Sequence, residues 1–122
     1  MEELEPTIGE DLYQNKKARA AEIVYEVTTQ QSSLPFGIAI ADIQQSEAHF
    51  HKVTWETYTV VQGNLEVYLD GERHVLHPGD VIKIPLWVVH FAKSLDETPA
   101  RITVTTIPEF SPEDYYLATE RA

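Results

Sequence analysis

The chain has 122 residues, of which 43% are hydrophobic and 24% charged, and it contains no cysteine. This composition indicates one globular domain and excludes disulfides, thiolate zinc sites, iron–sulfur clusters and cysteine nucleophiles. The net charge of −11 argues against nucleic acid as a partner, because phosphate binding needs clustered lysine and arginine side chains. The apolar runs are too short for a membrane span and the acidic start lacks an apolar signal segment, so we expect a cytoplasmic protein without a membrane partner.

The chain order predicts a polar arm followed by a long series of strands. Residues 1–22 are weakly patterned, and good helix formers within residues 11–21 favour one short helix there. From residue 23 the sequence changes to short runs of β-branched and aromatic residues, with turn residues at intervals of roughly 8–12 positions. An antiparallel sandwich or barrel over residues 23–108 is therefore expected. The predicted strands cover residues 23–28, 36–43, 49–53, 56–62, 65–69, 73–76, 81–84, 88–93 and 101–107.

The last segment, residues 109–122, is predicted to be a helical tail. Ser111 is a candidate N-cap and Pro112 occupies the first helical position. Glu113 and Asp114 follow in the first turn, where acidic side chains favour a helix. We expect this short helix to cover one end of the barrel.

A pair of histidines marks the most informative stretch of the chain. Residues two apart on a strand face the same side, so His49 and His51 would present two imidazoles together. Glu56 reaches that face only if the strand breaks within residues 52–55. Histidines satisfied within a β-rich core are the plainer interpretation. However, a buried carboxylate needs a cation or strong hydrogen bonds, and this set suits a divalent transition metal, with His90 as a fourth ligand.

Two motifs resemble those of the cupin superfamily. The segment His49-x-His51-x4-Glu56-x6-Gly63 looks like the first cupin motif, and Gly79-x5-Pro85-x4-His90 looks like the second. The resemblance covers about residues 36–107. It implies a double-stranded β-helix of jelly-roll type, with Zn, Mn, Fe, Ni or Cu held by His49, His51, Glu56 and His90. Small cupins commonly dimerise, so it also implies a homodimer.

Three positions depart from the cupin pattern. Ile43 stands where the first motif usually begins with glycine. The second motif reads Pro85-Leu86-Trp87 in place of Pro-x-Gly, and Ser94 replaces the usual trailing asparagine. None of these positions is a ligand. They imply a differently shaped mouth, with Trp87 over the entrance.

Tyr58 lies two residues beyond Glu56 and should also face inward. It is either a packed tyrosine or a group that gives or takes a proton beside a metal-bound substrate. The Glu-x-Tyr pattern resembles archaeal-type phosphoglucose isomerases and dimethylsulfoniopropionate lyases, where in the lyases the tyrosine is a base. We therefore expect a metal-dependent isomerase or lyase for a small polar oxygenated molecule, with Tyr58 and Glu56 as catalytic residues.

Two other functions stay open. The same four ligands around iron, copper or nickel resemble quercetin-type dioxygenases, and a redox-active ion that consumes O₂ would favour that function. A small cupin can also bind a small molecule without catalysis. A pocket sealed by Trp87, Phe91 and Tyr58 would favour this third function.

Overall fold

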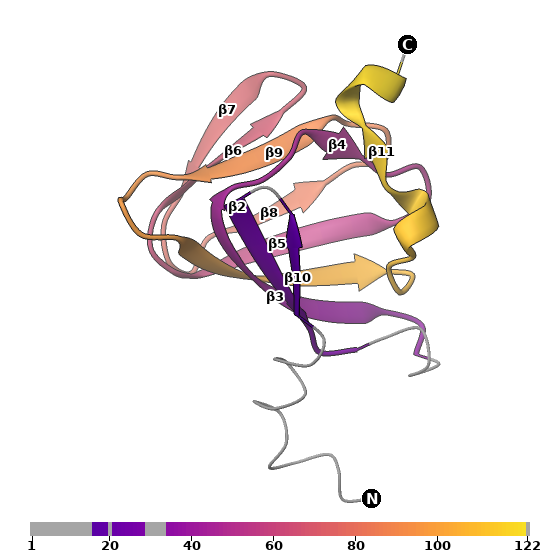
Figure 1. Cartoon of the computed structure of the whole chain (residues 1–122), viewed down its shortest axis with the longest axis horizontal. Coiled ribbons are helices and arrows are strands. Elements are labelled where there is room, and N and C mark those ends of the chain that lie inside the picture. Colours follow the sequence, from indigo (N-terminus) through magenta and orange to yellow (C-terminus); the bar gives the residue numbers. More distant parts are fainter. Residues whose placement is uncertain (1–15, 20, 29–33, 122) are drawn as a thin grey trace, which may run out of the picture.

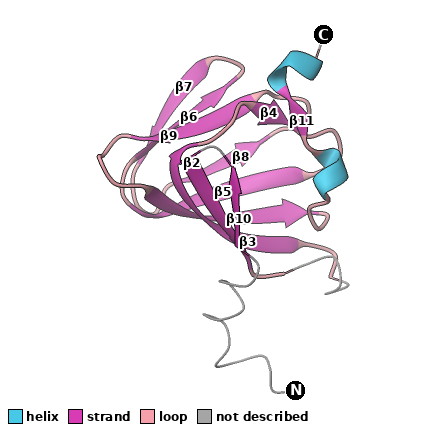
Figure 2. Ribbon diagram, viewed as in Figure 1, coloured by secondary structure: helices cyan, strands magenta, loops and turns pink. Residues whose placement is uncertain are grey.

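The computed structural model describes residues 16–19, 21–28 and 34–121, and these residues are mostly β-strand (Figure 1). The only helical elements within them are two short 3₁₀ turns, η2 (Pro112–Asp114) and η3 (Ala118–Glu120), which stand out in Figure 2. No helix in this part of the chain has the length and apolarity to cross a membrane. The strands are β1 (Lys16–Arg19), β2 (Ala21–Glu26), β3 (Gly37–Gln45), β4 (His49–Phe50), β5 (Trp55–Gln62), β6 (Leu65–Leu69), β7 (Glu72–Leu76), β8 (Val81–Ile84), β9 (His90–Ser94), β10 (Ala100–Ile107) and β11 (Tyr116–Leu117).

The strands pair antiparallel and curl into a nearly closed barrel with two walls. One wall follows the order β1-β2-β3-β10-β5-β8, and the other follows β7-β6-β9-β4-β11. The Gln45–Lys93 pair between β3 and β9 joins the two walls. Figure 1 shows the walls enclosing a common interior. The predicted all-β jelly-roll barrel is confirmed, because β-branched and aromatic runs separated by turn residues favour many short antiparallel strands.

The barrel interior divides into a polar end and an apolar end. Side chains alternate along a strand, so every second residue faces inward. On β5 the buried inward residues are Glu56, Tyr58 and Val60, and on β9 they include His90 and Ala92. Glu56 and His90 stand at the polar end. The residues that follow them join the apolar cluster, whose buried members are Ala41, Ile43, Tyr58, Val60, Leu65, Val67, Leu76, Ile84, Ala92, Ala100 and Ile102.

Two turns in the described part of the chain place a residue other than glycine in the left-handed backbone conformation. The predicted hairpin between β6 and β7 turns at Asp70 and Gly71, whose φ angles are 49° and 88°, as a mirror-image turn between twisted strands requires. Trp87 has a φ of 68°, at the position where the second cupin motif usually has glycine. This conformation costs a non-glycine residue about 1–2 kcal/mol. It allows the Trp87 N–H to donate to the His51 carbonyl at 2.7 Å, which fixes the chain just after β4.

The N-terminal arm contributes a strand to the sheet. Residues Lys16–Arg19 form β1 and pair antiparallel with β2. The helix predicted within residues 11–21 is therefore wrong for residues 16–19, because pairing with an available sheet edge outweighs a weak helix propensity. The rest of that prediction, apart from residue 21 in β2, lies outside the described residues.

The C-terminal tail is also not the helix that its capping signal predicted. Ser111 does act as a cap, since its hydroxyl accepts from the Glu113 N–H at 3.3 Å, but only the single 3₁₀ turn η2 follows. Tyr115 is extended, with a φ of −131°, and leads into β11. Because β11 pairs with β4, the chain satisfies its backbone groups in the sheet and the helix ends after one turn.

Candidate metal centre

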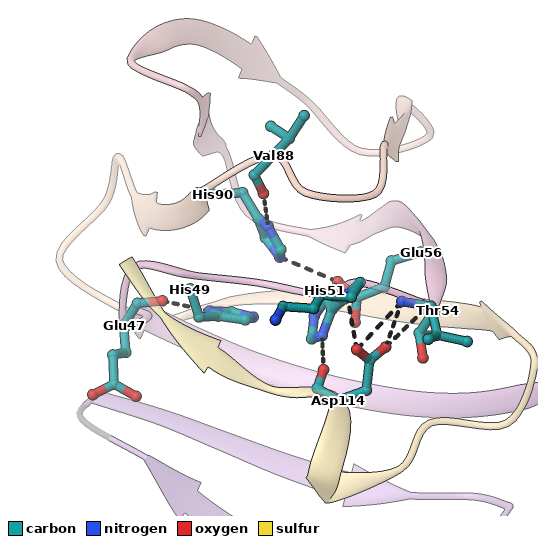
Figure 3. A network of polar contacts seen from close by, with 10 residues as sticks. Glu47, His49, His51, Thr54, Glu56, Val88, His90 and Asp114 are labelled. Atoms are coloured by element: carbon teal, nitrogen blue, oxygen red, sulfur yellow. Dashed lines mark hydrogen bonds and ion pairs between the residues drawn. The ribbon is translucent and has the colours of Figure 1, made fainter. Parts of the chain in front are cut away.

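The four side chains singled out in the sequence meet at the polar end of the barrel (Figure 3). His49 lies on β4 directly opposite His90 at the start of β9, and His51 follows β4. The chain breaks between β4 and β5, so Glu56 turns inward as the odd spacing required. All four residues are buried, and one ligand atom from each lies within 4.8 Å of the others.

Backbone carbonyls fix the orientation of all three imidazole rings. The Nδ1 atoms of His49, His51 and His90 lie 2.6, 2.6 and 3.0 Å from the carbonyl oxygens of Glu47, Asp114 and Val88. A carbonyl oxygen only accepts hydrogen bonds, so each Nδ1 must carry a proton and donate it. In the neutral ring, Nε2 then keeps its lone pair, and Figure 3 shows the rings turned towards one another and Glu56.

Three inward atoms of this cluster have no hydrogen-bond partners among the described residues. His51 Nε2 and His90 Nε2 lie 3.3 and 3.2 Å from the same Glu56 Oε1, but all three atoms are buried and unsatisfied. Lone pairs facing one another without a proton between them repel. Neutral imidazole nitrogens and a carboxylate oxygen are ligands for divalent transition metals, and outer carbonyl acceptors on the opposite nitrogens are typical of metal-binding histidines. The residues therefore fit a metal ion.

The charge states of the cluster also favour metal binding. Burial, together with the neighbouring His90, lowers the pKa of His49 to about 3, so this ring is neutral at physiological pH. Burial raises the pKa of Glu56, but His51 and His90 lower it more, and the net pKa is well below the usual range. Burial lowers the pKa of His51, yet the contact with Glu56 outweighs it and the net pKa is raised. A proton and a metal therefore compete for the space between His51 and Glu56.

Asp114 holds the loop between His51 and Glu56, a role that the sequence pattern did not predict. One carboxylate oxygen accepts from the Lys52 N–H at 2.8 Å and the other from the Thr54 N–H at 2.8 Å, while the Val53 N–H reaches both. Burial raises the pKa of Asp114, but these donors lower it more, so the net pKa falls below 3.8. The Asp114 carbonyl also accepts from His51 Nδ1. The sequence signal was only an acidic residue after a helix cap, which predicts neither contact.

Aromatic residues of the C-terminal segment complete the wall of the site. Tyr115 stacks on His49 with ring centroids 4.3 Å apart, and its hydroxyl donates to Glu47 at 2.6 Å. Phe110 meets His51 edge-on, with ring centroids 5.7 Å apart.

Tyr58 faces inward as predicted, and burial and the Glu56 carboxylate raise the pKa of its phenol well above the usual value.

A pocket of about 700 Å³, including its open mouth, leads to this cluster. Trp87 does not lie over its entrance, so that expectation is wrong: Trp87 stacks on Phe50, which points to the other side of β4 from the histidines. Phe91 stacks on Tyr68 and does not line the pocket either. The lining residues are Glu22, Val24, Glu26, Thr28, Gly37, Ile38, Ala39, Ala41, His49, His51, Glu56, Tyr58, Val104, Thr106, Glu109, Phe110 and Tyr115.

Known proteins share parts of this chain and its fold. An uncharacterized protein of Aquifex aeolicus is 34% identical over 73 residues, which are 59% of this chain and 60% of that protein. Quercetin 2,3-dioxygenase of Bacillus subtilis is 48% identical over 42 residues, which are 34% of this chain and 12% of the enzyme. The alignments thus span three fifths or less of these relatives.

Solved structures agree on the fold. A Streptomyces PAC13 variant with uridine superimposes with a TM-score of 0.75 and 18% identity, covering 97% of this chain and 95% of that one. Another PAC13 structure is described as a nucleoside dehydratase. Oxalate decarboxylase of Bacillus subtilis gives a TM-score of 0.74 at 18% identity, covering 90% of this chain and 31% of the enzyme. At such identities the likeness shows the fold alone.

The family assignment depends on a match across more than half of the chain. The family model of the cupin domain matches residues 40–106, from β3 to β10. That range contains His49, His51, Glu56 and His90, the four side chains that meet in the barrel. The chain therefore belongs to the cupin domain family.

Proposed function

We propose that the protein is a divalent-metal-dependent enzyme of the isomerase or lyase type that acts on a small polar oxygenated molecule. The observation that supports this most is the convergence of the inward histidine nitrogens and the Glu56 carboxylate at the end of an open pocket. The pocket gives a small molecule access to the ligand cluster, and an enzyme needs such access where a purely structural metal site does not.

His49, His51, Glu56 and His90 would hold the metal, and a metal there supplies Lewis-acid polarisation of a substrate carbonyl or hydroxyl oxygen. The other functional group on this wall is Tyr58, which shares the inner face of β5 with Glu56. Its raised pKa keeps the phenol protonated at neutral pH, so Tyr58 starts as a proton donor. The lowered pKa of Glu56 keeps the carboxylate ionised, which suits a metal ligand and makes it a weak base, so Glu56 would accept a proton only after leaving the metal. Isomerisation and elimination both move a proton, and Tyr58 or a displaced Glu56 would carry it.

A dioxygenase is the second candidate, and one observation favours it. A segment of 42 residues is 48% identical to quercetin 2,3-dioxygenase of Bacillus subtilis, a protein of named activity. The two functions differ in the ion they need, because oxygenase chemistry requires a redox-active metal.

A homodimer and a cytoplasmic location stay predictions. The exposed Trp55 beside its cross-strand partner Ile107 supports the dimer.

The test measures proton removal directly, so that the natural substrate need not be known. Protein of measured metal content is incubated in D₂O with small α-hydroxy and β-hydroxy carbonyl compounds, and NMR follows exchange of the C–H beside the carbonyl. We expect exchange with the metal-loaded protein, at least a hundredfold slower exchange in Tyr58→Phe, and an unchanged rate in Tyr68→Phe, which removes a hydroxyl that donates to Glu66 outside the pocket.

An oxygen electrode separates the candidates in the same samples. O₂ uptake with quercetin, without deuterium exchange, would contradict the isomerase or lyase proposal and support the dioxygenase. Metal-loaded protein that neither exchanges protons nor consumes O₂ would leave the non-catalytic binding protein as the function.

A further inference from the structure

A row of inward positions leads from the metal centre across the pocket wall. Thr106 on β10 is the direct partner of Glu56 on β5 and also of Gly37 on β3. Residues directly opposite each other in neighbouring strands face the same side of the sheet. Adjacent strands are ~4.8 Å apart, so Thr106 is one strand and Gly37 two strands from Glu56. All three residues line the pocket.

Two polar atoms on this row have no partner among the described residues. Thr106 Oγ1 is buried and unsatisfied, in a residue only 5% exposed. Glu109, just beyond the end of β10, has a buried and unsatisfied Oε1 and also lines the pocket. Leaving such groups buried without a hydrogen bond costs about 1–3 kcal/mol each, and more for a charged group. A bound ligand that supplies a donor would recover this free energy.

Gly37 lies directly against these two oxygens. A Cβ at Gly37 would collide with Thr106 Oγ1 at 2.5 Å and come within 3.2 Å of Glu109 Oε1. Glycine at this position therefore allows both oxygens to lie where they do without a side chain between them. The missing side chain and the two unsatisfied oxygens define a small polar cradle, separate from the four ligand atoms of the metal centre.

The charge of the pocket decides which ligand group fits this cradle. The described lining residues include four glutamates and neither lysine nor arginine. A second carboxylate or a phosphate would therefore meet like charge at Glu109 without a cationic partner among these residues. An ammonium or hydroxyl group would instead donate to the Glu109 carboxylate and to Thr106.

We propose that Thr106, Glu109 and Gly37 form a second subsite, which binds a hydrogen-bond-donating ammonium or hydroxyl group of the substrate while the other end of the same molecule lies at the metal centre. This inference rests on the proposed function, because it assumes that the pocket holds a metal-bound small molecule. It narrows the substrate class to molecules with an oxygen ligand at one end and a donor group at the other.

Calorimetric titration of the metal-loaded protein tests this subsite with simple probes. The probes are ω-amino carboxylates from 3-aminopropanoate to 6-aminohexanoate, together with ω-hydroxy, unsubstituted and dicarboxylate compounds of equal length. At the best chain length we expect the ω-amino or ω-hydroxy compound to bind at least tenfold more tightly than the unsubstituted one. The dicarboxylate should bind most weakly.

Two variants locate the effect. Thr106→Val removes one hydroxyl at constant shape and should reduce the preference for both donor types about tenfold. Glu109→Gln keeps the size of the side chain and should reduce the preference for the ammonium probe more than that for the hydroxyl probe. Thr105→Val, on the exposed face of the same strand, and Glu97→Gln, an exposed glutamate outside the pocket, should leave both preferences unchanged.

The two proposals fail in different ways. Protein that takes up no metal after loading, measured by elemental analysis, overturns the proposed function and this subsite with it. Metal-loaded protein that binds dicarboxylates as tightly as ω-amino and ω-hydroxy compounds, or that keeps its preference in Thr106→Val and Glu109→Gln, overturns the subsite alone.

Discussion

Two segments far apart in the chain build the metal centre in different ways. The motif segment, residues 49–56, supplies three of the four candidate ligands. The C-terminal segment, residues 110–115, supplies none, yet it touches two of those ligands and the loop between them. Most of the ligands therefore come from one short stretch of sequence, whereas their orientation depends on a distant part of the chain.

The difference follows from the hydrogen-bonding needs of the loop between β4 and β5. The break that turns Glu56 inward leaves the N–H groups of Lys52, Val53 and Thr54 without a strand partner. Buried N–H groups need acceptors, and the Asp114 carboxylate accepts from all three. The same residue accepts the His51 Nδ1 proton through its carbonyl. One residue of the C-terminal segment therefore fixes both the loop and the ring.

Removing a ligand from the motif segment should have the largest effect. We expect His51→Ala to retain almost no metal, because the site loses one of four ligands and leaves Glu56 without its neighbour. Elemental analysis of dialysed protein measures this. His77→Ala is the matched control, because this exposed histidine lies outside the cluster. Equal metal content in the two variants would contradict the ligand assignment.

Removing the Asp114 carboxylate from the C-terminal segment should have a smaller effect. Asp114→Ala leaves three N–H groups without their acceptor, one of them buried and two partly buried, so we expect a loss of about 3 kcal/mol in the free energy of unfolding. Metal affinity should fall about 10–100-fold, as for other groups that orient ligands. Urea denaturation and competition with a chelator measure the two effects. Glu113→Ala, on the exposed neighbouring residue, should show neither, and an unchanged metal affinity in Asp114→Ala would show that the C-terminal segment does not orient the site.

The pH dependence of the stability that Asp114 contributes should be the smallest effect. The net pKa of Asp114 is lowered in the folded protein, below the value of 3.8 for an unperturbed carboxyl. The carboxylate therefore contributes stability at pH values above about 3.8, and the contribution disappears as the pH falls through the folded-state pKa. We expect metal-free Asp114→Asn to be less stable than the wild type at neutral pH, with the difference shrinking in acid. A difference that stays constant down to pH 2 would exclude a charge-dependent role for Asp114.

Several features of the fold and the site could be predicted because they depend on local pattern. Alternation along β5 placed Glu56 and Tyr58 on one face, and the Asp70-Gly71 turn marked a hairpin. The spacing of His49 and His51 anticipated a shared face, and the four candidate ligands do meet. Each of these inferences needs only the two-residue repeat of a strand or the steric demands of a turn.

Other features could not be predicted because they depend on contacts between distant segments. Trp87 was expected to cover the pocket, but its backbone N–H donates to the His51 carbonyl and its ring stacks on Phe50, on the other side of β4. The cap at Ser111 predicted a helix, but pairing of β11 with β4 ended it after one turn. Thr106 gave no signal, because its importance comes from its neighbours in two other strands.

The sequence by itself determined the β-strand architecture and the set of candidate ligands, because both follow from residue types at short and regular spacings. Only the tertiary structure decided which ring nitrogen of each histidine faces the centre, since that choice depends on carbonyl groups such as that of Asp114. It also decided that Thr106 Oγ1 and Glu109 Oε1 on the pocket wall have no partner among the described residues, because hydrogen bonding is settled only when all neighbouring strands are in place.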